Sequence, residues 1–158
     1  MLILLYLLLG VVLALLYIWL ARRAPLIGEM ANYTIGLIVA ALIYVGFAVR
    51  GGTNEWLWLE ILGVVIYGGV ALLGLRGSPL LIALGWGAHP LWDAVLHPLQ
   101  TTDFVPYWYA WACIGFDLML AGYIVWHWWN RRKLGQELPQ QPFNRSHIGI
   151  FRDGIRIE

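Results

Sequence analysis

The chain of 158 residues has few charged side chains. Only 12% of its residues are Asp, Glu, Lys or Arg and 61% are hydrophobic, whereas roughly a quarter of the residues in a soluble domain are charged. The formal net charge of +1 gives no reason to expect a nucleic-acid partner, because nucleic acids select strongly basic surfaces. The single cysteine, Cys113, excludes a disulfide within the chain. Most of this sequence is therefore suited to a lipid bilayer rather than to water.

Two motifs are also missing from the sequence. It has no internal repeat, so the inverted-repeat architecture of many secondary transporters has no support here. It also lacks the His-Glu-x-x-His motif of soluble metalloproteases. The connections between its apolar segments are too short to hold a soluble domain, and we expect a single helical bundle to form the body of the protein.

Five apolar segments are long enough to cross the hydrocarbon core, which takes about 20 helical residues. They run approximately over residues 2–20, 31–49, 56–75, 79–97 and 107–128. The predicted fold class is therefore all-α: a polytopic membrane bundle of about five transmembrane helices.

The two ends of the chain are expected to differ. We interpret the first apolar segment as a retained anchor, because Arg22 and Arg23 follow it instead of preceding it as in a signal peptide. Residues 1–129 are predicted to form the transmembrane domain and residues 130–158 a cytoplasmic tail. The last stretch of the tail, residues 147–158, alternates weakly and is read either as a solvated tail or as a short strand against a partner.

Basic residues predict the orientation in the membrane. Arg22 and Arg23 follow the first segment, Arg76 follows the third and residues 131–133 follow the fifth, whereas the opposite loops hold only Arg50. Because cytoplasmic loops carry the excess of Lys and Arg, the N-terminus is expected outside and the C-terminus inside.

The fourth segment carries a stripe of polar residues within the stretch GWGAHPLWDAVLHPL, residues 85–99. His89, Asp93 and His97 recur at intervals of four residues, so a helix places them along one face. Pro90 cannot donate a backbone hydrogen bond and should kink this helix beside His89.

Two carboxylates on neighbouring segments match this stripe in depth. With a rise of 1.5 Å per residue and alternating directions, Glu60 falls at the level of Asp93, and Asp117 falls at the level of His89 near the middle of the membrane. A charge at the bilayer centre costs roughly 2.5–3.5 kcal/mol on insertion scales, so such groups usually have partners or a function. We assign His89, Asp93 and His97 as candidate metal ligands and Glu60 and Asp117 as candidate catalytic carboxylates.

These residue types favour a divalent metal site. Imidazole and carboxylate groups at one level suit zinc, with iron and manganese as alternatives. The leading hypothesis is a metal-dependent hydrolase in which the ion activates a water and the remaining carboxylate acts on it. A lipid-like substrate would match the depth of the site.

Three other interpretations of the same residues stay open. The site could be a proton or cation pathway in which these groups relay charge. The protein could be a noncatalytic subunit of a larger membrane complex, or a homo-oligomer. The polar groups could also be structural hydrogen-bonded pairs between helices; the pairs considered are His89 with Asp117, Asp93 with His97, and Glu60 with Tyr67. His127 stands among tryptophans beside the inner basic residues, and we interpret it as part of an interfacial anchor.

Residues 85–99, with the five-segment pattern around them, resemble a functionally uncharacterised family of small bacterial multi-pass membrane proteins over roughly residues 30–130. This resemblance implies the fold and a location in the bacterial inner membrane, and no activity.

The polar stripe is also similar in outline to intramembrane zinc hydrolases of the alkaline ceramidase and adiponectin receptor superfamily. In that superfamily a His-x3-His pair on one helix, another His and an Asp hold zinc, which implies zinc-dependent hydrolysis here. Asp93 stands in the place of the second His of the pair, and five spans are expected where that superfamily has seven.

Overall fold

The structure is a computed structural model that describes residues 1–23, 28–97 and 104–137, with the side chains of residues 134–137 left out. The described part of the chain forms helices and contains no strand, which confirms the all-α prediction. The helices are α1 (Leu2–Arg23), α2 (Glu29–Gly51), α3 (Asn54–Arg76), α4 (Pro79–Leu96) and α5 (Tyr107–Glu137).

Each of the five predicted apolar segments falls within one of these helices, apart from His97, which caps α4. The last helix is longer than its apolar segment, because α5 continues past residue 129 as far as Glu137. Residues 147–158, which are expected to form a solvated tail or a short strand, lie outside the described residues.

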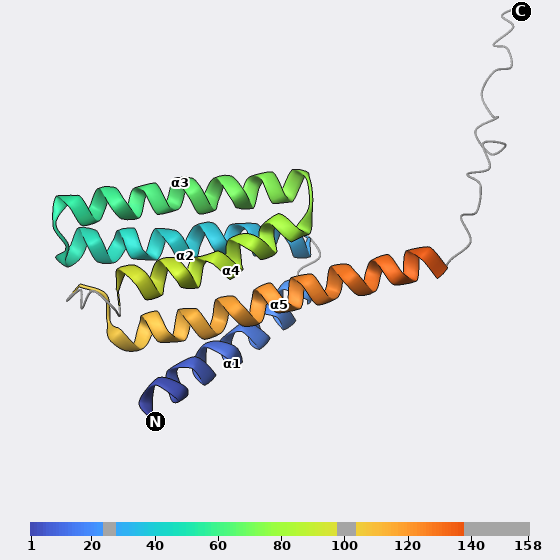
Figure 1. Cartoon of the computed structure of the whole chain (residues 1–158), viewed down its shortest axis with the longest axis horizontal. Coiled ribbons are helices and arrows are strands. Elements are labelled where there is room, and N and C mark those ends of the chain that lie inside the picture. The colour runs from blue at the N-terminus through green and yellow to red at the C-terminus, as the bar shows by residue number, and fades with distance from the viewer. Residues whose placement is uncertain (24–27, 98–103, 138–158) are drawn as a thin grey trace, which may run out of the picture.

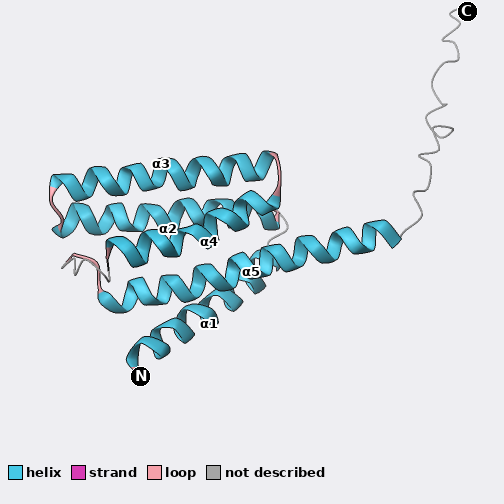
Figure 2. Ribbon diagram, viewed as in Figure 1, coloured by secondary structure: helices cyan, strands magenta, loops and turns pink. Residues whose placement is uncertain are grey.

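The helices form one bundle (Figure 1), and the same view coloured by secondary structure shows the short loops that join α2 to α3 and α3 to α4 (Figure 2). Helices α2, α3, α4 and α5 run side by side with alternating directions, whereas α1 crosses α5 obliquely at the edge of the bundle. Helix α4 contacts α2, α3 and α5, and α1 has α5 as its main partner. The polar stripe of α4 is thus surrounded by other helices.

Four of the described helices are long and apolar enough to cross a membrane: α1, α2, α3 and the Tyr107–Lys133 part of α5. These helices indicate an integral membrane protein. Helix α4 is not among the four; its 18 residues include His89, Asp93 and two prolines, which lower its mean hydropathy. The side chains of His89 and Asp93 are buried, so the polar groups that lower the hydropathy of α4 are shielded by its neighbours.

Two glycines set the distance between α1 and α5. A Cβ on Gly10 would lie 1.9 Å from the carbonyl oxygen of Ala112, and a Cβ on Gly115 would lie 2.2 Å from the carbonyl oxygen of Leu7. Only a residue without a side chain allows two backbones to approach so closely, which is the common use of small residues between membrane helices.

Local contacts hold α4 in place at its start and its middle. The Ser78 side chain accepts a hydrogen bond of 3.3 Å from the backbone N–H of Leu80, and Pro79 occupies the first turn, where no backbone donor is needed. Farther along, the indole N–H of Trp86 donates to the carbonyl oxygen of Tyr33 on α2 over 3.1 Å. Trp86 is fully buried, and this contact ties α4 to α2 one turn before His89.

Candidate metal centre

Three buried side chains meet in the interior of the bundle, and we call His89, Asp93 and Asp117 the polar centre. The Nδ1 atom of His89 lies 2.8 Å from Oδ2 of Asp117 on α5 and 3.5 Å from Oδ2 of Asp93 one turn along α4. One ligand atom from each residue lies within 4.8 Å of the other two. An ion bound at about 2.1 Å from each ligand would hold its ligands roughly 3.0–3.5 Å apart. The polar centre could therefore hold a metal ion after small adjustments.

Asp93 is the residue in this group whose polar atoms are least satisfied. Its side chain is 0% exposed, and neither carboxylate oxygen meets full hydrogen-bond geometry with a described group; the donors near it are Nδ1 of His89, at 3.5 Å, and the hydroxyl of Tyr44. A buried carboxylate without hydrogen bonds is costly, by several kcal/mol when it is ionised. The cost falls if Asp93 binds a proton, or if a cation lies between the side chains of the polar centre.

Aromatic rings cover the polar centre. The Tyr67 ring stands edge-on to the His89 ring with centroids 4.9 Å apart, and the Tyr44 ring lies 5.8 Å from it. The hydroxyl of Tyr67 donates to the carbonyl oxygen of Ala88 over 3.2 Å. These rings separate the polar centre from lipid and lower the local dielectric, which strengthens any charge interaction inside it.

A second pair of polar residues lies next to the polar centre, and we call Glu60 and His97 the outer pair. Nε2 of His97 lies 3.2 Å from Oε1 of Glu60, and the indole N–H of Trp92 donates to Oε2 of Glu60 over 3.2 Å. The His97 ring stacks on Tyr44 with centroids 4.7 Å apart. Tyr44 therefore contacts a histidine of each group.

The structure divides the five residues chosen from the sequence into these two groups. Asp117, assigned from the sequence as a catalytic carboxylate, forms a hydrogen bond of 2.8 Å with His89 and so belongs to the polar centre, whereas His97, assigned as a ligand, lies beside Glu60. The pairing of His89 with Asp117 follows the depth calculation. The hydrogen bond between Asp93 and His97 that was considered from the sequence is not formed, and the Tyr67 hydroxyl bonds to a carbonyl oxygen instead of Glu60.

A third polar group, at the opposite end of the bundle, was not found from the sequence. Oε1 of Glu29 accepts hydrogen bonds from the hydroxyls of Tyr33 (2.9 Å) and Tyr123 (2.8 Å), and its Oε2 lies 3.9 Å from Nε2 of His127. Nε2 of His127 accepts a hydrogen bond of 2.9 Å from Arg131. No signal in the sequence marked this group, because Glu29 precedes the apolar segment 31–49 whereas Tyr123 lies inside the apolar segment 107–128.

Comparison of the chain with protein-family models, with curated proteins and with solved structures finds no match.

Proposed function

We propose that this chain is a membrane protein with an intramembrane divalent metal centre formed by His89, Asp93 and Asp117. The observation that carries the proposal is Asp93, whose two buried carboxylate oxygens do not meet full hydrogen-bond geometry with a described group although a histidine and a second carboxylate lie within reach. A cation at this position would contact the buried Asp93 carboxylate and neutralise its charge.

Charge balance supports the same proposal. With His89 neutral, the two carboxylates of the polar centre carry two negative charges inside an apolar bundle, and a divalent ion cancels both. Metal binding would also replace the proton that His89 Nδ1 shares with Asp117, so uptake of the ion should release protons. Zinc is the favoured ion, with iron and manganese as alternatives that an elemental analysis separates.

The proposal includes five membrane spans, with the N-terminus outside and the polar centre reached from the outer side. Its support is the alternation of helix directions around the bundle, the burial of the polar residues of α4, and the basic residues at the inner ends of α1, α3 and α5. A bacterial inner membrane is the proposed location.

A hydrolytic role is the finer form of the proposal. Three protein ligands leave a coordination position in which an ion can activate a water. A cavity of about 370 Å³ between α1, α2, α4 and α5 reaches Asp117 and is otherwise lined mainly by apolar side chains, which suits a lipid-like substrate. In this form Glu60 is the carboxylate left to act as a base.

The main alternative is a proton pathway. The outer pair and the polar centre both contact Tyr44, and buried acids and histidines in such a series are typical of proton relays. A relay needs no ion, so metal content separates the two functions.

The test uses Asp93→Asn, which keeps the shape of the side chain and removes its charge. Because asparagine keeps an oxygen that can accept from the hydroxyl of Tyr44 and removes a buried charge, the variant should fold and should melt no lower than the metal-free wild type. We expect the purified wild-type protein to hold one divalent ion per chain by plasma mass spectrometry, and the variant to bind it more than about 100-fold more weakly, since changes outside the ligand shell already cost about 10–100-fold.

The matched control is His127→Ala, which removes a histidine far from the polar centre and should leave metal content unchanged. A chelator should lower the melting temperature of the wild type and of this control but not that of Asp93→Asn, because an ion that binds only the folded state stabilises it. A wild-type protein that stays free of metal after loading, or an Asp93→Asn variant that binds as well as the control, would rule out the metal centre and leave the relay.

A further inference from the structure

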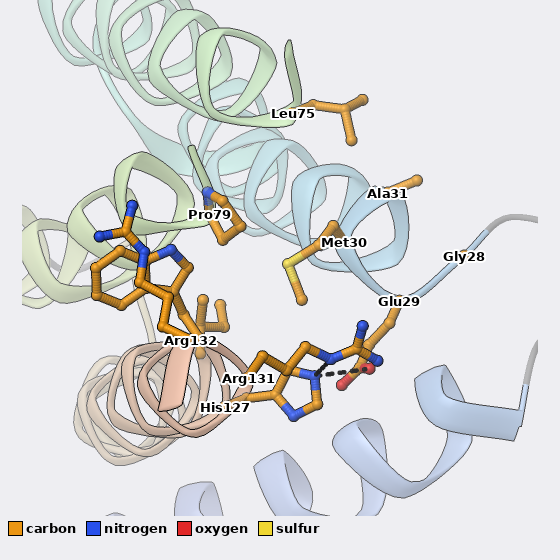
Figure 3. Close-up of a pocket in the computed structure, with 11 residues that line it drawn as sticks. Gly28, Glu29, Met30, Ala31, Leu75, Pro79, His127, Arg131 and Arg132 are labelled. Carbon is orange, nitrogen blue, oxygen red and sulfur yellow. Dashed lines mark hydrogen bonds and ion pairs between the residues drawn. The ribbon is translucent and has the colours of Figure 1, made fainter. Parts of the chain in front are cut away.

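A cavity of about 600 Å³ lies at the opposite end of the bundle from the outer pair. We call it the inner cavity. It is bounded by the start of α2, the end of α3, the start of α4 and one face of α5, and Figure 3 shows α5 with His127, Arg131 and Arg132 on one side and Met30 and Pro79 facing them from other helices. The volume is in the range of small-molecule sites, which is about 300–1,000 Å³.

The inner cavity is apolar inside and basic at its edge. Met30, Leu75, Pro79 and Ile124 line its interior. Arg131 and Arg132 are exposed and follow Ile124, His127 and Trp128 at helical spacing, so α5 presents an apolar residue, then an aromatic one, then two guanidinium groups along one face. This order matches an amphiphile whose apolar part points into the membrane.

Both arginines are held in place without losing their capacity to bind an anion. The guanidinium of Arg132 lies over the Trp128 ring at 4.1 Å from the centroid, and such stacking leaves the N–H groups at its edge free to donate. In the described contacts Arg131 uses its Nε–H for His127, which leaves its Nη groups for a ligand.

Glu29 is the acidic residue in the wall of the inner cavity, and one of its oxygens is already engaged. Oε1 accepts from two tyrosine hydroxyls and Oε2 lies beside His127. Two arginines face one such carboxylate, so the edge of the cavity carries a net positive charge. The positive ends of the α2 and α4 dipoles, at Gly28 and Pro79, point the same way.

We infer that the inner cavity binds the phosphate headgroup of an anionic phospholipid. Arg131 and Arg132 donate hydrogen bonds to the phosphate, and the part of an acyl chain nearest the headgroup packs against Met30 and Ile124. Basic pockets between membrane helices near the inner surface are typical of such lipid sites. This site is separate from the polar centre and does not depend on a metal there.

The test measures the thermal stability of the full-length protein in nonionic detergent micelles. Added phosphatidylglycerol should raise the melting temperature with a saturable dependence on concentration, whereas phosphatidylcholine and inorganic phosphate at the same phosphate concentration should not. A double variant, Arg131→Gln with Arg132→Gln, should bind phosphatidylglycerol at least about tenfold more weakly, because each lost charge-assisted hydrogen bond is worth about that factor or more.

The matched control is the double variant Arg23→Gln with Arg76→Gln. It removes the same charge from the same end of the bundle, at two exposed residues that do not line the inner cavity. Equal weakening in both double variants would show attraction to the general basic surface and overturn the proposed site. A shift produced by phosphatidylcholine or by inorganic phosphate alone would overturn the assignment to an anionic lipid.

Discussion

The contact between α1 and α5 gives the sharpest structural prediction. Gly10→Ala would place a methyl group 1.9 Å from the carbonyl oxygen of Ala112, about 1.5 Å closer than the 3.4 Å at which ordinary van der Waals contact begins. Neither atom belongs to a flexible side chain, so the helices must separate. Overpacking by one methyl group costs about 1–3 kcal/mol, and here the cost falls on the main contact of α1.

The matched control is Gly122→Ala on α5, where an added Cβ meets nothing within 4 Å. Both variants gain the same helix propensity, at most about 1 kcal/mol, so the difference between them isolates the contact. Thermal unfolding in detergent should show Gly10→Ala melting below Gly122→Ala by roughly 2–4 °C for each kcal/mol, the scale for soluble chains of this size. Equal melting temperatures would refute the close approach of α1 and α5.

Two further predictions concern orientation and the outer pair. In a Cys113→Ser background, a cysteine at exposed Thr53 should react with an impermeant thiol reagent added outside, whereas a cysteine at exposed Lys133 should react only after the membrane is opened; the reverse pattern would invert the orientation. Glu60→Gln keeps one carboxamide oxygen that can accept from the indole N–H of Trp92, whereas Glu60→Leu leaves that buried donor without its acceptor and should cost about 1–3 kcal/mol more. Equal unfolding of these two variants in a denaturant titration would show that the Glu60 contacts do not stabilise the bundle.

The sequence by itself determined the helices and the depth of the polar residues. The lengths of the apolar runs predicted the helices because a helix in a bilayer must satisfy its own backbone over the full hydrocarbon thickness. Alternating directions and a constant rise per residue then placed His89 level with Asp117, and the structure joins these two side chains over 2.8 Å.

Only the tertiary structure decided which polar groups share a site. His97 continues the stripe of His89 and Asp93 along α4, yet it lies beside Glu60, because α3 meets the C-terminal end of this stripe and α5 meets its start at His89. Depth follows from counting along one helix, but the order of helices around the bundle and the rotation of each about its axis depend on packing against neighbours. In a helix such as α3, whose small and apolar residues occur on several sides, the sequence does not mark which side faces which neighbour.

The end of the bundle that holds Glu29 and His127 shows the same limit. The sequence indicated that His127 belongs to an aromatic and basic interface, and the structure places it beside Tyr123, with ring centroids 5.7 Å apart. The hydrogen bond from the hydroxyl of Tyr123 to Glu29 joins the middle of α5 to the start of α2, and these two residues are 94 positions apart in the chain. The hydrophobic periodicity within one helix carries no information about a contact between residues so far apart in the chain. The contact between Glu29 and Tyr123 therefore follows only from the way the helices pack.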